Sequence, residues 1–240
     1  MVSKSQIKLI TSLGQKKYRE RHGLFVVEGI KGITEFLQSH FKLHSLFTVS
    51  GFFEEVSADR KTTVDDRGLK KISFLKTPQK AVAIFYIPSE SPVKENGFQV
   101  ALDDIRDPGN LGTIIRLCDW FGIEQLVCSN KTVDCYNPKV IQATMGSLTR
   151  VQILYTDLKQ YLAGKNSLVY GAFMDGDNVY KSELKTKGIL VLGNEANGIS
   201  PNVEEHVTHK IAIPQFGTSK TESLNVATAA AILISEFKRG

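Results

Sequence analysis

The stretch that decides the fold is QVALDDIRDPGNLGTIIRLCDWFGI, residues 99–123. Its apolar start is bulky with little polar alternation, which predicts a buried parallel strand over 99–104, and the pattern after the DPGN turn predicts a helix over 111–121. Two later apolar runs also end in turns rich in glycine or asparagine: GILVLGNEANGIS, residues 188–200, and KIAIPQFGTSKTESLNVATAAAILISEF, residues 210–237. Ligands bind at the carboxyl ends of the strands in open α/β sheets. The three turns therefore predict one site assembled from separated segments.

Strands and helices alternate around these runs. Further strands are predicted at 124–128, 168–173, 188–192 and 209–213, and helices near 137–147, 201–206 and 224–237. This βα alternation predicts an α/β domain with a mostly parallel sheet and flanking helices over residues 98–240. A linker at about 88–97, rich in Pro, Ser, Lys, Glu and Gly, separates it from residues 1–90.

Residues 1–90 also alternate between helical and extended patterns. Helices are predicted over 3–21 and 30–40, and strands over 24–29, 43–49 and 81–87. The pattern predicts a smaller α/β layer structure.

The composition is that of an ordinary globular protein, with 42% hydrophobic and 23% charged residues. No apolar stretch approaches ~18 residues, and the N-terminus lacks the apolar core of a signal peptide. Cys118, Cys128 and Cys135 are odd in number and lack metal-ligand spacing. Cys118 and Cys128 lie among apolar residues, which favours buried free thiols at these two positions. The pair His206 and His209 is a weak metal signal by itself. We therefore expect a cytoplasmic protein without a metal.

The formal charge of +5 is concentrated at the N-terminus. The first 21 residues contain Glu20 as their one acidic residue against Lys4, Lys8, Lys16, Lys17, Arg19 and Arg21. A basic segment before a nearly neutral domain fits a polyanion such as RNA, with Lys16, Lys17, Arg19 and Arg21 as candidate contacts. A solvated, lysine-rich helix face would give the same pattern.

Together, the three C-terminal segments resemble the SpoU-type (TrmH-like) RNA 2′-O-ribose methyltransferases of the SPOUT superfamily. The residues that carry this resemblance are Asn110, Gly112 and Arg116 in the first segment, Gly193, Glu195 and Gly198 in the second, and Ile213-Pro214, Gly217 and Ser223-Leu224-Asn225 in the third. The run KYRERHGLFVVEGIKGITEFL, residues 17–37, also resembles the start of the substrate-binding domain that precedes many SpoU catalytic domains.

The resemblance implies a fold, a reaction and a set of partners. The implied fold adds a deep trefoil knot in the C-terminal part. The implied reaction transfers a methyl group from S-adenosylmethionine to a ribose 2′-hydroxyl of RNA. The basic N-terminal part of this chain favours ribosomal RNA over transfer RNA as the substrate. A homodimer is implied, because the family completes its site across two subunits. Neither a membrane nor a metal is implied.

The resemblance also implies roles for individual residues. The implied catalytic residues are Arg116, Asn110, Glu195, Ser223 and Asn225. The implied cofactor-binding residues are Leu192, Gly193, Asn194, Gly198, Ile213, Pro214, Gly217, Leu224 and Asn225. Lys220, in a loop two residues longer than the family usually has, is a further candidate for RNA contact. A guanidinium keeps its proton near pH 7, so we expect Arg116 to bind phosphate and orient the 2′-hydroxyl rather than act as a base.

Several of these residues also have purely structural explanations. Arg116 could pair with Asp119 on its own helix, Asn110 and Ser223 could each cap a helix, and Glu195 could be a solvated loop carboxylate. Gln142 and Thr144 stand where the family commonly has an arginine and a serine, which would alter substrate handling.

Other functions remain open on the sequence alone. They are a transfer RNA ribose methyltransferase, an RNA-binding module without catalysis, and a nucleotide- or phosphosugar-handling α/β enzyme. The last is disfavoured because no phosphate-binding glycine loop follows the first strand.

Overall fold

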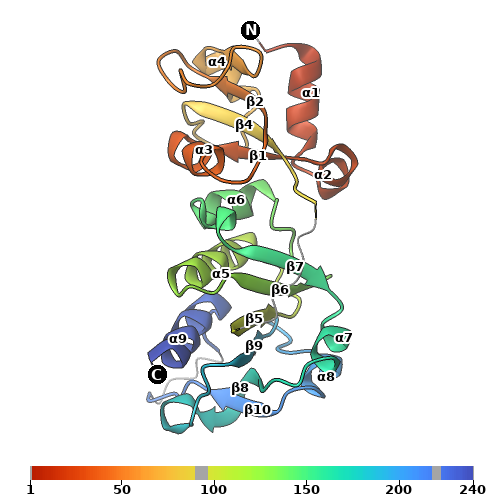
Figure 1. Ribbon diagram of the computed structural model, residues 1–240, viewed down its shortest axis with the longest axis vertical. Coiled ribbons are helices and arrows are strands. Elements are labelled where there is room, and N and C mark those ends of the chain that lie inside the picture. Colours follow the sequence, from red (N-terminus) through yellow and green to blue (C-terminus); the bar gives the residue numbers. More distant parts are fainter. Residues whose placement is uncertain (1, 90–96, 218–222, 240) are drawn as a thin grey trace. The chain divides into compact units, whose positions relative to one another are not determined.

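The computed structural model describes residues 2–89, 97–217 and 223–239 and contains two compact units (Figure 1). Unit 1 comprises residues 1–90 and 134–149, and unit 2 comprises residues 91–133 and 150–240. The division differs from the predicted one, 1–90 and 98–240, in the segment 134–149, which packs with the N-terminal part. Most of the predicted linker, 88–97, lies outside the described residues. None of the described helices is long and apolar enough to cross a lipid bilayer.

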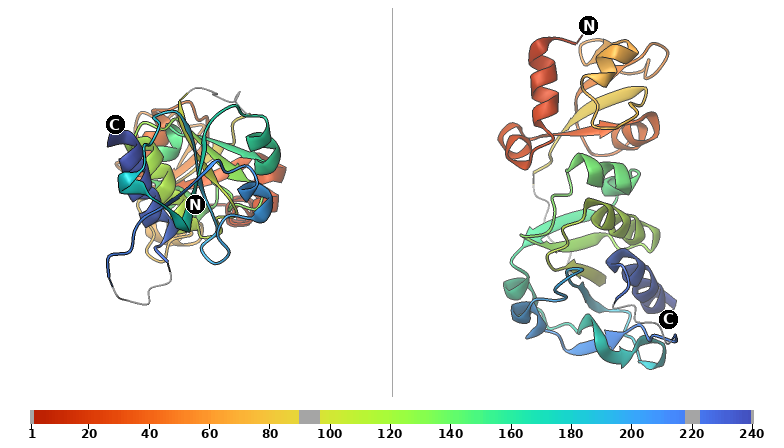
Figure 2. Two further views of the ribbon diagram at one scale, coloured as in Figure 1. Left: turned by 90° about the horizontal axis from the view of Figure 1, so that it is seen from below. Right: turned by 180° about the vertical axis from the view of Figure 1, so that it is seen from behind.

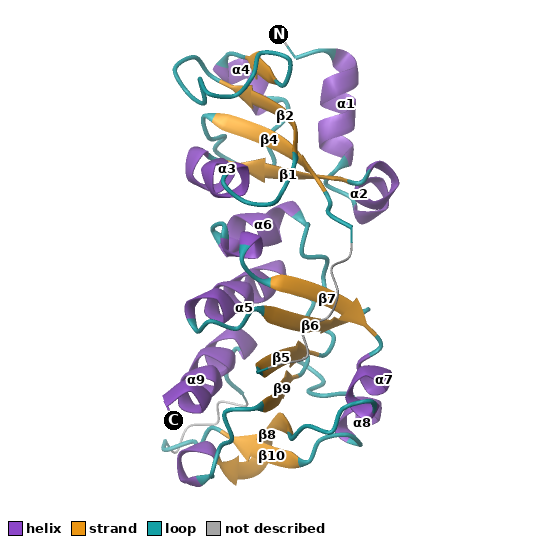
Figure 3. Ribbon diagram, in the orientation of Figure 1, coloured by secondary structure: helices purple, strands orange, loops and turns teal. Residues whose placement is uncertain are grey.

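Unit 1 is a mixed sheet covered by helices (Figure 3). Its strands are β1 (Leu24–Glu28), β2 (Leu43–Thr48), β3 (Lys61–Thr63) and β4 (Ala81–Tyr86). They lie in the order β1-β4-β2-β3, with β4 antiparallel to both neighbours and β3 parallel to β2. Its helices are α1 (Lys4–Ser12), α2 (Lys16–His22), α3 (Ile30–Leu37), α4 (Asp66–Lys70) and α6 (Pro138–Thr144), and a 3₁₀ turn, η1, spans Ser147–Thr149.

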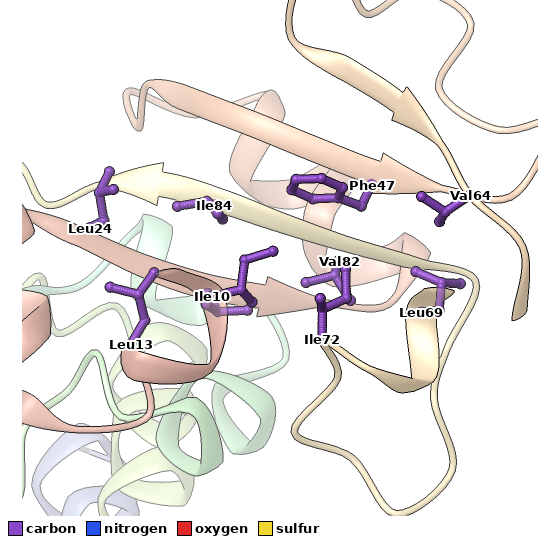
Figure 4. Close-up of a cluster of buried hydrophobic side chains, with 10 residues drawn as sticks. Ile10, Leu13, Leu24, Phe47, Val64, Leu69, Ile72, Val82 and Ile84 are labelled. Carbon is purple, nitrogen blue, oxygen red and sulfur yellow. The ribbon is translucent and has the colours of Figure 1, made fainter. Parts of the chain in front are cut away.

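The core of unit 1 lies between α1 and the sheet. Ile10 and Leu13 of the N-terminal segment pack against Val82 and Ile84 of β4, together with Phe47 of β2 (Figure 4). The helix predicted over 3–21 is broken here, because α1 ends at Ser12 and α2 begins at Lys16. Gly14 lies at the break, and a Cβ there would meet the Phe74 ring at 2.8 Å. The close approach of that ring leaves no room for a side chain at position 14.

Unit 2 contains a six-stranded parallel sheet in the order β10-β8-β9-β5-β6-β7. The strands are β5 (Phe98–Leu102), β6 (Gln125–Ser129), β7 (Gln152–Thr156), β8 (Val169–Asn178), β9 (Gly188–Leu192) and β10 (His209–Ala212). The helices are α5 (Pro108–Trp120), α7 (Leu158–Ala163), α8 (Pro201–Glu204) and α9 (Val226–Arg239), with a 3₁₀ turn, η2, at Val179–Lys181. The predicted mostly parallel α/β sheet is thus confirmed.

Helices cover both faces of this sheet, as a parallel sheet requires. Helices α5 and α9 pack together on one side, and α7 and α8 pack together on the other (Figure 2). Under α7 and α8, Val127 and Val191 form an apolar layer with Leu158 and Val203. On the opposite side, the Phe98 ring lies 4.6 Å from the Phe237 ring of α9. The sheet is therefore a rigid base for the loops at its carboxyl edge.

Cys118 and Cys128 are buried free thiols, as predicted, and Cys135 is a third. Burial raises the pKa of Cys118 to about 12, so this thiol stays protonated at neutral pH.

Candidate functional site

The turns after β5 and β9 are tied together at the carboxyl edge of the unit 2 sheet. The Asp103 amide donates to the Leu192 carbonyl over 2.9 Å. The buried Asp103 carboxylate accepts from the Ser200 amide at 2.8 Å and from its hydroxyl at 2.6 Å. Sequence reasoning did not single out Asp103 or Ser200, although the paired aspartates at the end of the first strand are a visible signal. These bonds hold two of the three predicted turns side by side.

The loop 193–198 is shaped by its own asparagine and glycines. Asn194 Oδ1 accepts from the amides of Ala196 and Asn197 at 3.0 and 3.1 Å, and its Nδ2 donates to the Asp104 carbonyl at 2.8 Å. A Cβ on Gly193 would overlap the backbone of Gly198 and the next residue. The Asn194 side chain is thus used within the loop, and the loop presents mainly backbone groups to a ligand.

Asp104 adds a fixed negative charge beside this loop. Its carboxylate forms two hydrogen bonds with the Arg106 guanidinium, at 2.9 and 2.8 Å. These bonds lower the pKa of the Asp104 carboxyl, so it is ionised at neutral pH.

The cap of α5 is Asp107, not Asn110. Its side chain accepts from the Asn110 amide at 2.8 Å, and Pro108 occupies the first helical turn. The prediction that Asn110 caps this helix is therefore wrong. Because Asp107 satisfies the helix end, the Asn110 side chain is available for contacts elsewhere.

Asn110 joins the three predicted segments. Its Nδ2 donates to Glu195 Oε1 over 2.7 Å, and its Oδ1 accepts from Asn225 Nδ2 over 2.9 Å. Glu195 belongs to the loop after β9, and Asn225 directly precedes α9. The single site expected from the separated turns is thus present as a continuous set of hydrogen bonds.

Asn225 also caps α9. Its Oδ1 accepts from the amides of Ala227 and Thr228 at 2.9 and 3.2 Å. The prediction that Ser223 caps α9 is wrong. The cap is Asn225, which the sequence did not suggest for this role. Ser223 and Leu224 are exposed beside it.

Arg116 lies on α5 six residues after Asn110, about 9 Å along the axis and about 120° around it. It is exposed, and among the described residues it has no hydrogen bond or ion pair. The alternative that it pairs with Asp119 does not hold, since Asp119 pairs with Arg150 at 2.9 Å. The guanidinium is free to bind an anion, but it is not part of the Asn110 network.

The third predicted loop follows β10. Ile213 and Pro214 are half-buried, whereas Gly217 is exposed and Phe216 is 86% exposed. Lys220, with the rest of 218–222, lies outside the described residues. Leu192 is buried at the end of β9, so it can offer a ligand only its backbone.

The basic residues predicted to bind RNA divide into two groups. Lys16, Lys17 and Arg21 are exposed on α2. Arg19 is 2% exposed and donates to the Asp134 carboxylate and, at 2.8 Å, to the Leu13 carbonyl. Arg19 is therefore a structural residue of unit 1 and is not available to RNA.

A metal site is not found in the parts of the chain that the structure describes, where no three His, Cys, Asp or Glu side chains are grouped as ligands. The arrangement instead offers glycine-rich backbone, an amide–carboxylate network and an exposed arginine that has no partner among the described residues. Such groups can bind and orient an uncharged or anionic substrate.

Comparison with known proteins supplies further findings. Residues 97–235 match the SpoU rRNA Methylase family, and residues 4–83 match the MRM3-like substrate binding domain. The 23S rRNA (guanosine(2553)-2′-O)-methyltransferase RlmP of Bacillus subtilis is 28% identical over 94% of this chain and 93% of its own length.

Solved structures resemble the whole chain. A TrmH-family protein from Porphyromonas gingivalis is 40% identical, with a TM-score of 0.91 over 100% of this chain and 99% of that one. An AdoMet-bound rRNA methyltransferase from Sinorhizobium meliloti is 29% identical, with a TM-score of 0.89 over 100% of this chain and 97% of that one.

Proposed function

The chain belongs to the SpoU rRNA methylase family, and on that premise we propose that it transfers a methyl group from S-adenosylmethionine to a ribose 2′-hydroxyl of ribosomal RNA. The observation that carries the proposal is the hydrogen-bonded set Asn110, Glu195 and Asn225, which joins all three family motifs at one edge of the sheet. The exposed Arg116, on the same helix as Asn110, supports catalysis over an inactive RNA-binding module. The names of the relatives favour ribosomal over transfer RNA.

The residues present fit S-adenosylmethionine. The loop 193–198 closes tightly on itself at Gly193 and is exposed over residues 195–198, where a ligand can reach its backbone. Ile213, Pro214 and Leu224 offer apolar surface for an adenine, and Leu224 is 48% exposed. When bound, the cofactor supplies an activated methyl group on a sulfonium, and the role of the protein is alignment.

Arg116 and Asn110 have different roles in this proposal. Arg116 binds a substrate phosphate through its two-pronged guanidinium and so sets the position of the ribose. Asn110 fixes the Glu195 carboxylate beside the cofactor loop, and Asn225 holds Asn110 in turn. Ser223 is exposed next to Asn225, where it can contact substrate or cofactor.

The domain roles follow from the same premise. Residues 1–90 bind the RNA substrate, with Lys16, Lys17 and Arg21 as contacts, and residues 98–240 form the catalytic domain. We also assign to the C-terminal part the deep trefoil knot of the family, and to the protein a cytoplasmic location.

A test of the function has two parts. Isothermal titration calorimetry with the purified protein, with and without ribosomal RNA, is expected to show binding of S-adenosylmethionine. Mapping of 2′-O-methyl groups in RNA from cells with and without the protein is expected to reveal at least one site that depends on it. No binding even with RNA present, and no dependent site, would overturn the proposal.

We propose that the protein is a homodimer built by unit 2. The Trp120 ring is 84% exposed at the end of α5, one turn from Arg116 and on the same face. Exposed aromatic rings of this size are enriched at interfaces. Light scattering is expected to give twice the monomer mass, and Trp120→Asp is expected to shift it toward the monomer. A monomer at tens of micromolar wild-type protein would contradict this.

Reversing the hydrogen bond between Asn110 and Glu195 tests the network. Asn110→Asp removes the donor and places two carboxylates within hydrogen-bond distance, so we expect methyl transfer to fall by tenfold or more. In the double variant Asn110→Asp/Glu195→Gln the new amide can donate to the new carboxylate, while Asn225 still donates to its other oxygen. Single-turnover rates are expected to recover in part in the double variant. Additive losses would show that this bond does not matter for catalysis.

A further inference from the structure

A second candidate site lies in unit 1, at the end of the sheet where β2 begins and β4 ends. It is a pocket of about 360 Å³ lined by Phe41, Lys42, His44, Arg60 and Tyr86, among others. Its volume is within the range of small-molecule sites. None of these residues belongs to the basic group on α2 that the sequence suggested.

Tyr86 provides an open aromatic surface in this pocket. The five preceding residues of β4 are buried, but Tyr86 is 46% exposed. Its ring meets the His44 ring edge to face, at a centroid distance of 5.3 Å and an angle of 63°. The contact fixes the orientation of the tyrosine ring and leaves part of its surface to solvent.

His44 reaches the tyrosine because β2 is irregular at this point. The register between β2 and β4 shifts between Leu43 and Ser45, so His44 is the extra residue of a bulge. Bulges re-aim side chains and are frequent beside functional sites. Burial lowers the pKa of His44, so the ring is neutral at pH 7. A neutral imidazole has one nitrogen that donates and one that accepts, and can therefore form a hydrogen bond with a nucleobase.

Two cations border the same pocket. Lys42 is exposed and lines the pocket, and its carbonyl accepts from the Tyr86 amide at 3.0 Å. Arg60 donates to the Leu43 carbonyl at 3.4 Å, and its ion pair with Asp59 is loose, at 3.8 Å between exposed groups. Both cations can therefore take up a phosphate.

The basic helix α2 ends at the same end of the sheet. Its C-cap, Gly23, accepts through its carbonyl from the Ile87 amide at 2.8 Å, directly after Tyr86. Arg21 and His22, both exposed, lie in its last turn. The basic helix α2 thus ends close in the sheet to Tyr86, whose pocket is lined by Lys42 and Arg60.

We propose that this pocket binds one unpaired nucleotide of the RNA substrate, with the base stacked on Tyr86 and the flanking phosphates on Lys42 and Arg60. An aromatic ring between cations matches how proteins hold single-stranded RNA, whose unstacked bases are free to stack on side chains. The proposal rests on the proposed function, because it takes RNA as the substrate.

The first experiment measures binding of a fluorescein-labelled single-stranded RNA of mixed sequence by anisotropy. Tyr86→Ala is expected to weaken binding by about tenfold, and Tyr86→Phe, which keeps the ring, to stay close to wild type. Tyr180→Ala, at a tyrosine of similar exposure in unit 2, is the control and is expected to have no effect. The same RNA as a duplex is expected to lose the Tyr86 dependence.

The second experiment tests the cations through the salt dependence of binding. Lys42→Ala/Arg60→Ala is expected to lower the slope of log affinity against log salt by about 1.4, or about 0.7 for each lost phosphate contact. The control Arg67→Ala/Lys70→Ala removes the same charge from exposed positions of α4 and is expected to leave the slope unchanged. Melting curves by circular dichroism verify that each variant is folded.

Two outcomes overturn the pocket proposal: wild-type RNA binding by folded Tyr86→Ala, or equal slopes for the two double variants. Methyl transfer by the wild-type protein is measured separately. If the wild-type protein transfers methyl groups and Tyr86→Ala binds RNA as tightly as the wild type, only the pocket proposal fails. If the wild type transfers no methyl group, the proposed function fails, whatever the anisotropy shows.

Discussion

Replacing Arg116 by alanine is expected to lower the rate of methyl transfer by about 10²-fold or more, with affinity for S-adenosylmethionine close to wild type. The arginine is exposed, and it has no partner among the described residues. Its loss therefore leaves no buried group unpaired and should not destabilise α5. What it removes is alignment of the ribose, and alignment contributes several kcal/mol to such reactions.

The conservative variant sharpens this test. Arg116→Lys keeps the charge but loses the planar pair of donors, so it is expected to fail nearly as badly. Arg67→Ala, at an exposed arginine of unit 1, is the control and should leave the rate unchanged. Single-turnover transfer of labelled methyl groups to the mapped RNA gives the rate, and calorimetry gives cofactor affinity for each variant. Near-normal turnover in Arg116→Ala would show that Arg116 is a surface residue with no role in methyl transfer.

The parallel sheet could be predicted because each of its central strands contains a bulky apolar run with little polar alternation. β5, β6 and β9 are buried at every residue. β7 lies at the edge of the sheet, and every one of its residues is only half-buried. Its sequence, QILYT, follows neither a continuous apolar run nor a clean alternation, and sequence analysis missed it. Edge strands are harder to predict for this physical reason.

Three of the residues that the sequence singled out lie together in the structure, but their local roles differ from the predicted ones. Family resemblance pointed to Asn110, Glu195 and Asn225, and hydrogen bonds join all three. The two helix caps were assigned to the wrong neighbours, since Asp107 and Asn225 cap α5 and α9. Asp, Asn and Ser are all good caps, and two of them lie within a few residues at each helix start. Sequence alone cannot choose between them, because the choice depends on what else each side chain can reach.

Arg19 illustrates a second limit. Within a run of basic residues it has the pattern of an RNA contact, yet it is buried against Asp134, 115 positions along the chain. No local pattern indicates such a pairing. The same applies to the segment 134–149, in which Tyr136 packs against Phe25 at 4.7 Å between ring centroids. Long-range contacts within unit 1 therefore determine both the burial of Arg19 and the position of the segment 134–149.

Asp134→Asn is expected to destabilise unit 1 by about 3–5 kcal/mol, because it removes one partner of a buried ion pair and leaves the Arg19 charge uncompensated. Arg19 Nε donates to Asp134 Oδ2 at 2.8 Å, and the side chains are 2% and 14% exposed. The asparagine keeps the shape of the side chain and can still accept from the Tyr136 amide, which Asp134 Oδ1 now does at 2.9 Å. The expected loss of stability in Asp134→Asn therefore measures removal of the negative charge and not loss of the hydrogen bond to the Tyr136 amide.

Hydrogen exchange followed by mass spectrometry measures this loss separately in each unit. Amides of β1 and α6 are expected to lose protection by about 10²–10⁴-fold, at 1.36 kcal/mol per factor of ten, while amides of β5 and β9 keep theirs. The control variant, Lys16→Ala, removes an exposed ion pair with Glu20 on α2. It is expected to lower the free energy of unfolding by less than about 0.5 kcal/mol. The double variant Arg19→Met/Asp134→Leu should be more stable than Asp134→Asn, since an apolar pair leaves no buried charge. Unchanged protection in Asp134→Asn would mean that the pair contributes no more than a surface salt bridge.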